Sequence, residues 1–285
     1  MANNTTINSE LFTNLLAEAQ FAMYENSIAR QIVTPFSFPA NAGKTLSVPV
    51  YSAVTAASLT EGSAPSAADT NTTSVSINLG EVGTYFQVTD FLRDSAQRDV
   101  IADLGAQAGR AIAEKMDNDV FALFNSFSAS VGTEDSPVTV DNILTAVATL
   151  RQAKVIGPLA CVVGPRQALQ LKKELAGTGG TTALTANALG NEALRAYYIG
   201  TLAGCSVYES SLVKSDLDTD TDTELNMVGA VFAPTAIGHA IRGGVVMEEQ
   251  RQAAARATDI MISVVKGEAI LQNSHGVKIV GSATD

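Results

Sequence analysis

The residues best suited to bind a ligand form an acidic run from Asp216 to Glu224, in which aspartate occupies every second position up to 222. An EF-hand calcium loop uses carboxylates at this spacing and also needs Gly at its sixth position and Glu at its twelfth. Counted from Asp216, those positions hold Thr221 and Met227, and a start at Asp218 fits no better. We therefore interpret the run as a solvated loop, with a weak cation site where several copies meet as the alternative.

Other residues that could support chemistry lack their partners. The stretch 177–182 is rich in Gly and Thr, but no Gly-Lys-Ser/Thr ending follows to reach a phosphate. The Gly-Pro-Arg at 164–166 does not match a nucleophile elbow, and no Gly-x-Ser-x-Gly motif occurs with a histidine nearby. Only His239 and His275 are available for general-base or metal chemistry. We predict no catalytic residue, no cofactor and no metal site, and therefore a protein that is not an enzyme.

The two cysteines, Cys161 and Cys205, match neither a CxxC redox motif nor a four-ligand metal set, and both stand in apolar, strand-like segments. We predict two reduced thiols in the core. A hydrophobic content of 46% with only 16% charged residues indicates a folded, soluble chain of 285 residues. The net charge of −11, without basic runs, argues against gripping nucleic acid through phosphates but permits enclosing DNA.

Membrane and export signals are not evident in the sequence. No apolar run approaches the roughly 20 residues that a spanning helix requires. Residues 1–10 lack the basic start and apolar stretch of a signal peptide. We expect no membrane partner and no export.

An N-terminal arm is predicted first. Apolar residues from Leu11 to Ile28 approximate one helical face behind a cap at Ser9, and Thr34-Pro35 closes the segment. Two prolines and an Asn-Ala-Gly turn within 35–43 then indicate a turn-rich connection.

Two strands with a long tip between them are predicted next. Residues 45–54 and 74–79 have the alternation and β-branched content of strands. The tip, 56–73, consists mainly of Ala, Ser, Thr, Gly and Pro, so it can bury little apolar area. We expect the tip to project unless a neighbouring molecule holds it, with an ordinary solvent loop as the alternative.

The longest periodic segment predicts a helix from Asp99 to Phe127. A helix-start signature covers 90–99, and apolar residues then recur at three- and four-residue steps. At 1.5 Å per residue this helix would be about 43 Å long. Small residues at 105, 106 and 109 on its flank would let another backbone approach closely.

The remaining sequence alternates helices and strands, which indicates an α+β fold. The predicted helices are 142–154 and 166–175, and the predicted strands are 159–163, 197–208, 227–233 and, as short strands with turns between them, 236–242, 245–250, 260–266 and 277–280. No internal repeat or strong linker divides the chain.

The order of these parts resembles the HK97-type fold of phage major capsid proteins, which encapsulin shells share. The resemblance is carried by the arm, the loop between two strands, the long helix and four short segments. These are CVVGPRQAL at 161–169, IGTLAGCSVY at 199–208, AIRGGVVMEEQR at 240–251 and GVKIV at 276–280.

The resemblance implies an HK97-type division of the chain. Its parts would be an N-terminal arm (1–44), an extended loop with its strands (45–86), a peripheral domain with the spine helix (87–133), an axial domain (134–240), return strands of the peripheral domain (241–267) and a C-terminal axial strand and tail (268–285).

The resemblance also implies a function and partners. The chain would be a major capsid protein that self-assembles as pentamers and hexamers into the icosahedral shell around the double-stranded DNA of a tailed phage. A separate scaffolding protein is implied, because no acidic helical prefix of roughly 100 residues precedes the arm. A portal protein at one vertex and a decoration protein are further implied partners, with the virion as final location and the host cytoplasm as assembly site.

Two other shell or tail functions remain alternatives. An encapsulin-type compartment shares the fold, and packaged DNA would distinguish the two. A tail-tube protein would contain mostly β structure. A hydrolase is a third class, for which the sequence offers no catalytic constellation.

Some capsids of this fold join subunits through an isopeptide bond from a lysine on the extended loop to an asparagine. No lysine lies between Thr45 and Arg93; Lys44 stands at the base of the loop and Lys115 within the long helix. We therefore predict that denaturing electrophoresis of mature particles gives a single band near 29.6 kDa. A ladder of covalent oligomers that resists reducing agent would contradict this prediction.

Overall fold

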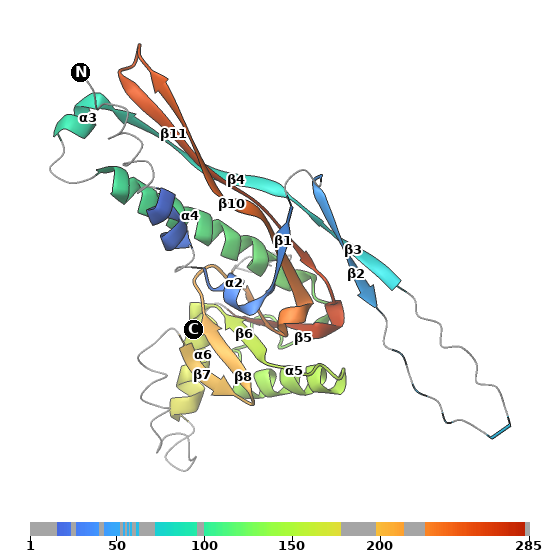
Figure 1. The fold of residues 1–285 in the computed structure, drawn as a ribbon. Helices are drawn as coiled ribbons and strands as arrows, with labels where there is room; N and C mark the ends of the chain where they lie inside the picture. The colour runs from blue at the N-terminus through green and yellow to red at the C-terminus, as the bar shows by residue number, and fades with distance from the viewer. Residues whose placement is uncertain are drawn as a thin grey trace.

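The structure is a computed structural model. It describes residues 16–23, 27–39, 43–51, 72–95, 100–177, 198–213 and 226–282, together with residues 54, 56, 58, 61 and 62. A four-stranded sheet with a long helix forms one part of the body, a six-stranded sheet with two helices forms another, and a two-stranded hairpin projects to one side (Figure 1).

The four-stranded sheet has the order β1-β10-β11-β4. Its strands are β1 (Thr34–Phe38), β10 (Ile237–Gln252), β11 (Ala257–Ile270) and β4 (Gly80–Thr89). The helix α4 (Val100–Ala122) packs on one face, where its Ile112 and Met116 join Ile260 and Ile262 of β11 in one buried cluster. The apolar stripe of the helix thus meets the inward-facing residues of alternating strands.

The long helix is confirmed, but it is shorter than predicted. The helix-start signature belongs to a separate helix, α3 (Asp90–Ser95), and α4 gives way after Ala122 to the 3₁₀ turn η1 (Leu123–Ser126). Phe124 and Phe127 continue the apolar stripe and are buried, because the tighter turn directs their rings into the second part of the body. Apolar spacing alone does not distinguish these two kinds of helix.

The six-stranded sheet has the order β5-β12-β9-β6-β8-β7. Its strands are β5 (Ala129–Val131), β12 (Gly276–Ser282), β9 (Asn226–Phe232), β6 (Leu159–Val163), β8 (Cys205–Glu209) and β7 (Tyr198–Leu202). The helices α5 (Val140–Gln152) and α6 (Pro165–Gly177) accompany it, and the 3₁₀ turns η2 (Pro234–Ala236) and η3 (Asn273–His275) lead into β10 and β12. The predicted α+β arrangement is confirmed.

Both faces of this sheet are buried at its central strand. On the central strand β6, Leu159 and Cys161 point into a cluster with α5 and α6, whereas Ala160 and Val162 point into a cluster that includes the end of α4 and Phe232. All five residues of β6 are therefore buried, which explains its continuous apolar run.

The C-terminal strands are longer than the sequence predicted. The segments 236–242 and 245–250 were expected to be separate strands, but they form the single strand β10, which pairs with β11 over most of its length. The register shifts between Arg242 and Val246, and Gly243 there adopts a positive φ of 71°. Gly243 and Gly244 therefore form a bulge within one strand instead of a turn between two strands.

The described part of the N-terminal segment lies on its own subunit. Helical residues 16–23 approach α4 so closely at Gly109 that a Cβ there would collide with the backbone oxygen of Ala19. The short helix α2 (Ala29–Ile32) follows, and then β1 pairs in parallel with β10. The turn predicted at Pro35 is wrong, because proline is tolerated in this edge strand.

The hairpin pairs β2 (Thr45–Tyr51) with β3 (Thr72–Asn78), as predicted. Most of the tip between them lies outside the described residues. A single residue, Leu79, separates β3 from β4. The hairpin meets the body at Gly267 of β11, where a Cβ would collide with the backbone oxygen of Asn78.

This close contact predicts that Gly267→Ala lowers the free energy of unfolding by about 1 to 3 kcal/mol, because backbone must move to admit the methyl group. Gly80→Ala is the matched control, since a Cβ at Gly80 meets nothing within 4 Å. Urea unfolding of both variants measures the difference, and equal midpoints would show that the contact is not tight.

Candidate assembly surfaces

The projecting hairpin has one apolar face and one polar face. Leu46 pairs with Ile77 and Val48 with Val75, and all four side chains share a face. Ile77 is fully buried against the body, but Val48 and Val75, farther out, are only half-buried. A two-stranded hairpin is marginally stable by itself in water. Its outer part therefore offers apolar surface that another molecule can cover.

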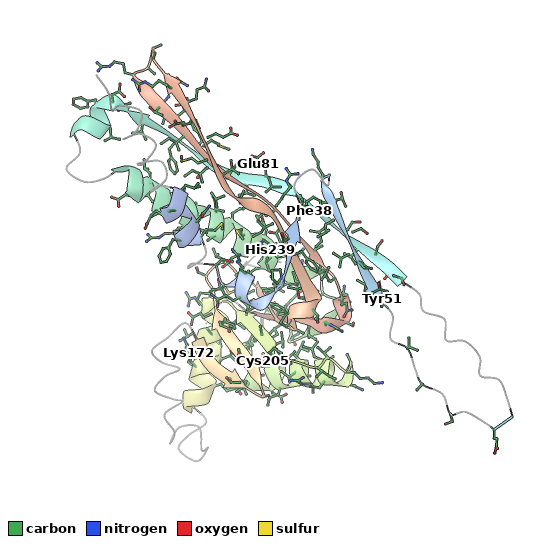
Figure 2. All side chains as sticks on the ribbon, viewed as in Figure 1. Phe38, Tyr51, Glu81, Lys172, Cys205 and His239 are labelled. Atoms are coloured by element: carbon green, nitrogen blue, oxygen red, sulfur yellow. The ribbon has the colours of Figure 1, made fainter. Side chains whose placement is uncertain are left out.

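The outer end of the hairpin is also exposed. Tyr51 ends β2 and stands well away from the body, with 69% of its surface exposed (Figure 2). Val54, the next described residue, is 58% exposed. Aromatic and aliphatic side chains exposed on a projection are typical of residues that become buried in contacts between molecules.

A buried carboxylate ties the N-terminal segment to α4. Asp117 accepts hydrogen bonds from the hydroxyl of Ser27 at 2.6 Å and from the backbone N–H groups of Ile28 and Ala29 at 2.9 and 3.1 Å. These donors lie at the start of α2, so a side chain some 90 residues away caps that helix. Burial raises the pKa of Asp117, although the three hydrogen bonds act in the opposite direction.

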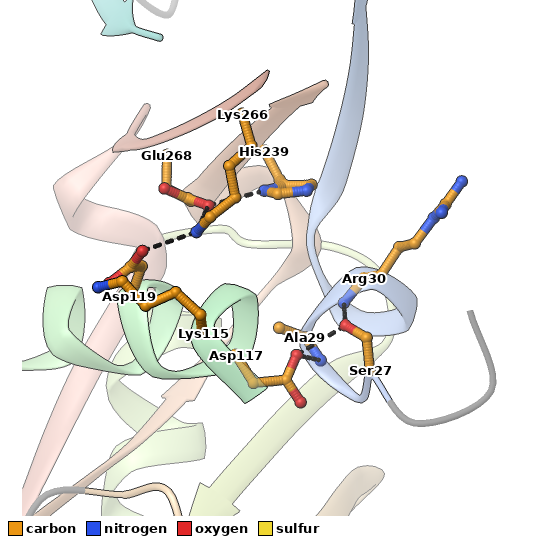
Figure 3. A network of polar contacts seen from close by, with 9 residues as sticks. All are labelled: Ser27, Ala29, Arg30, Lys115, Asp117, Asp119, His239, Lys266 and Glu268. Atoms are coloured by element: carbon orange, nitrogen blue, oxygen red, sulfur yellow. Dashed lines mark hydrogen bonds and ion pairs between the residues drawn. The ribbon is translucent and has the colours of Figure 1, made fainter. Parts of the chain in front are cut away.

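A second polar network connects α4 with β11 (Figure 3). The ammonium group of Lys266, which is only 2% exposed, lies 2.7 Å from carboxylate oxygens of both Asp119 and Glu268. Lys115 pairs with Asp119 one helical turn away. Burial acts to raise the pKa of Asp119, but the two lysines outweigh it and leave the pKa lowered. Asp119 is therefore ionised at neutral pH, and its pairing offsets the cost of burying Lys266.

His239 is buried beside this network. Its Nδ1 lies 3.2 Å from a Glu268 oxygen, without hydrogen-bond geometry. Figure 2 places it on β10, where that strand meets β1. The surrounding groups are a lysine and two carboxylates that already pair with one another, which is typical of a structural site.

Charged residues also fix α3 at the far end of the four-stranded sheet. Arg251 of β10 forms a bidentate pair with Asp90, at 2.7 and 2.6 Å. The pair raises the pKa of Arg251, chiefly through the hydrogen bond. The next residue, Phe91, is 83% exposed. The ion pair therefore fixes the start of α3, and the exposed ring of Phe91 follows directly after it.

The two cysteines and His275, which the sequence analysis also considered, lie in surroundings typical of structural residues. Cys161 and Cys205 are buried in the same cluster as free thiols, and their mutual contact and burial raise the pKa of Cys161. Burial lowers the pKa of His275, whose ring contacts the hydroxyl of Thr235 at 2.7 Å. The acidic run at 216–224 and residues 178–182 of the glycine-rich stretch lie outside the described residues.

The described part of the chain has neither a metal-binding cluster nor a membrane-spanning helix. There, three or more His, Cys, Asp or Glu side chains never converge closely enough to hold a metal ion. Likewise, none of the helices described is long and apolar enough to cross a membrane.

Sequence reasoning missed Asp117 and Lys266, although a signal for each was present. Asp117 stands four residues after Ala113 and three before Val120, which places it on the apolar stripe of the helix. Lys266 continues the inward-facing series that includes Ile262 and Val264. A charged residue at a position where the periodicity predicts burial indicates a hydrogen-bonding or oppositely charged partner in the core.

Comparison with known proteins places this fold. The profile of the family described as phage capsid protein matches residues 72–263, about two thirds of the chain. A search of the curated proteins found no relative.

The solved structures that resemble the chain come from several phage-related particles. A chain of Mycobacterium phage Che8 is 20% identical, with a TM-score of 0.63 over 84% of this chain and 85% of that one. The head structure of Helicobacter pylori bacteriophage KHP40 gives a TM-score of 0.69 at 11% identity, covering 91% of each chain. The capsid of a native GTA particle gives 0.67 at 15% identity, covering 93% of this chain and 91% of that one.

The fold is therefore that of HK97-type capsid proteins. The chain belongs to the phage capsid protein family, and it is a structural shell protein of the virion that associates with copies of itself. The encapsulin and tail-tube alternatives are not favoured, and the 23-residue helix α4 does not fit a mostly β tail tube.

Removing the carboxylate that caps α2 should loosen the N-terminal segment. Asp117→Ala leaves a hydroxyl and two backbone N–H groups without their acceptor, so we expect a loss of about 3 kcal/mol in unfolding free energy. Glu114→Ala, at an exposed position of the same helix, is the control and should change stability by less than about 0.5 kcal/mol. Denaturant unfolding measures both, and equal stability would show that Asp117 does not hold the segment.

Proposed function

We propose that this chain is the major capsid protein of a tailed phage and assembles as pentamers and hexamers into an icosahedral shell around double-stranded DNA. The observation that carries the proposal is the projecting hairpin, whose outer apolar face is only half-buried within the described subunit. Many modest contacts of this kind, repeated around a closed shell, stabilise an assembly without one large hydrophobic patch.

The proposed division of the subunit is the one that the HK97-type resemblance implies. Residues 45–86 would act as the extended loop, although β4 begins within this range and pairs with β11 of the body. Residues 87–133 and 241–267 would form the peripheral domain, and 134–240 with the C-terminal strand would form the axial domain near each capsomer centre. The arm would be 1–44, of which 16–23 and 27–38 contact the subunit's own α4 and β10.

The proposed partners are a scaffolding protein during assembly in the host cytoplasm, a portal protein at one vertex and a decoration protein on the finished shell. The net charge of −11 supports a wall that encloses DNA without adhering tightly to it. Sequence-specific contact with DNA is not part of the proposal.

Electron microscopy of the chain produced with and without its scaffolding protein tests this function. We expect closed shells with the scaffold and few or none without it, and nuclease-resistant double-stranded DNA in virions whose main protein band is this chain. A monodisperse monomer under every condition, by sizing and light scattering, would contradict self-assembly. Efficient assembly of the purified chain alone would contradict the need for a separate scaffold.

A further inference from the structure

His239 is a buried titratable side chain without a hydrogen bond. Only 3% of the side chain is exposed, and neither ring nitrogen has a hydrogen-bond partner among the described residues. Buried polar atoms in folded proteins are nearly always paired, so each exception requires an explanation. The distance of 3.2 Å from Nδ1 to the Glu268 carboxylate is already short enough for a hydrogen bond, and only the angle is unfavourable. A small rotation of the ring would complete this bond.

His239 lies where the N-terminal segment joins the body. On one side, β10 pairs with β1 and places Pro35 opposite His239; β1 contains no charged residue. Figure 3 shows the guanidinium of Arg30, on α2, directed away from the ring. The charged groups around His239 therefore come from β11 and α4, and they are Glu268, Lys266, Asp117, Asp119 and Lys115.

The charges of these five groups do not balance. When all five are ionised, three carboxylates are present with two ammonium groups, which leaves one negative charge in excess. Asp119 pairs with both lysines, and Lys266 pairs also with Glu268. Asp117 instead accepts its three hydrogen bonds from a neutral hydroxyl and two backbone N–H groups. A proton on His239 would supply the missing positive charge inside the cluster.

A positive charge on His239 would also act on the carboxylate that caps α2. Burial raises the pKa of Asp117, and a charged His239 ring acts in the opposite direction. The charged ring therefore keeps Asp117 ionised as the pH falls. Hydrogen bonds to an ionised carboxylate are stronger than those to a neutral group. The proton on His239 thus preserves the bonds that Asp117 accepts from Ile28 and Ala29.

We propose that His239 is a proton-binding site at the joint between the N-terminal segment and the body, and that proton uptake there strengthens this joint as the pH falls. Both nitrogens of a protonated ring are donors, so Nδ1 donates to Glu268 while the charge offsets the excess of carboxylates. Every group involved belongs to one subunit, so the proposal does not depend on the formation of a shell.

A proton NMR titration of the purified full-length subunit tests proton uptake directly. The chain has only two histidines, and the variant His275→Gln identifies which ring signal belongs to His239. We expect the His239 signal to shift in one step while circular dichroism shows that the subunit is still folded. A signal that moves only when the subunit unfolds would overturn the proposal.

The stability of His239→Gln at two pH values gives an energetic test. Glutamine is polar and does not titrate, so it retains a donor without taking up a proton. The partners of the bound proton are assembled only in the folded subunit, so proton uptake favours folding. From about pH 7.5 to about pH 5.5, the folding equilibrium constant of the parent relative to the variant should rise by roughly three- to tenfold in urea unfolding. A constant or falling ratio would contradict the proposal.

The variant His275→Gln is the matched control, and it should respond in the opposite direction. Burial lowers the pKa of His275 below its ordinary value of 6.5. Its ring therefore contributes stability above that value, and the contribution is lost as the pH falls. The stability of the parent relative to His275→Gln should decrease between the same two pH values. Equal increases relative to both variants would reveal a general effect of acid and would overturn the specific role of His239.

Amide hydrogen exchange locates the effect at the joint. At about pH 5.5, the amides of Ile28 and Ala29 should be less protected in His239→Gln than in the parent, whereas at about pH 7.5 their protection should be similar. Equal protection at the lower pH would show that His239 does not act on the joint. If His239→Gln does not fold, the NMR titration of the unaltered chain decides the proposal by itself.

Discussion

The structure depends on the packing of α4, whose single apolar stripe serves two buried clusters. Its first turns cover the four-stranded sheet through Ile112 and Met116. Its last turn and η1 enter the other cluster, on one face of the six-stranded sheet, through Val120 and Phe124. Because one rigid helix contributes to both clusters, the two sheets are held in one body without a separate linker between them.

The same helix holds the N-terminal segment by two different physical means. Close backbone approach at Gly109 accommodates residues 16–23, and the Asp117 carboxylate caps α2. The contact at Gly109 is possible because glycine has no side chain. The contact at Asp117 depends on a buried carboxylate that accepts three hydrogen bonds. The hairpin, in contrast, projects to one side of the body (Figure 1).

The hairpin projects because, unlike the N-terminal segment, it has few contacts with the rest of its own subunit. Only its base is covered, at Ile77 and Gly267, and its outer pairs show half-buried valines and open backbone edges. A shell subunit needs surfaces of this kind, since contacts completed within one chain cannot join it to another. The buried ion pairs of Lys266 act within the subunit instead. Lys266 finds both of its carboxylate partners in its own chain, so these pairs hold together the body that carries the hairpin.

The sequence by itself determined the local elements and their order. Apolar periodicity located α4, β6 and the hairpin, and the order of these elements indicated the capsid fold before any contact was known.

Elements fixed by long-range pairing were not predictable in this way. Pro35 indicated a turn, but pairing with β10 makes its segment a strand, and Gly243 indicated a break that the ladder with β11 absorbs as a bulge. Two partners also appeared only in the tertiary structure: Ser27 lies 90 residues from Asp117, and Asp119 lies 147 residues from Lys266. Periodicity reports which face of an element is buried, whereas the groups that meet that face are decided by how distant segments pack.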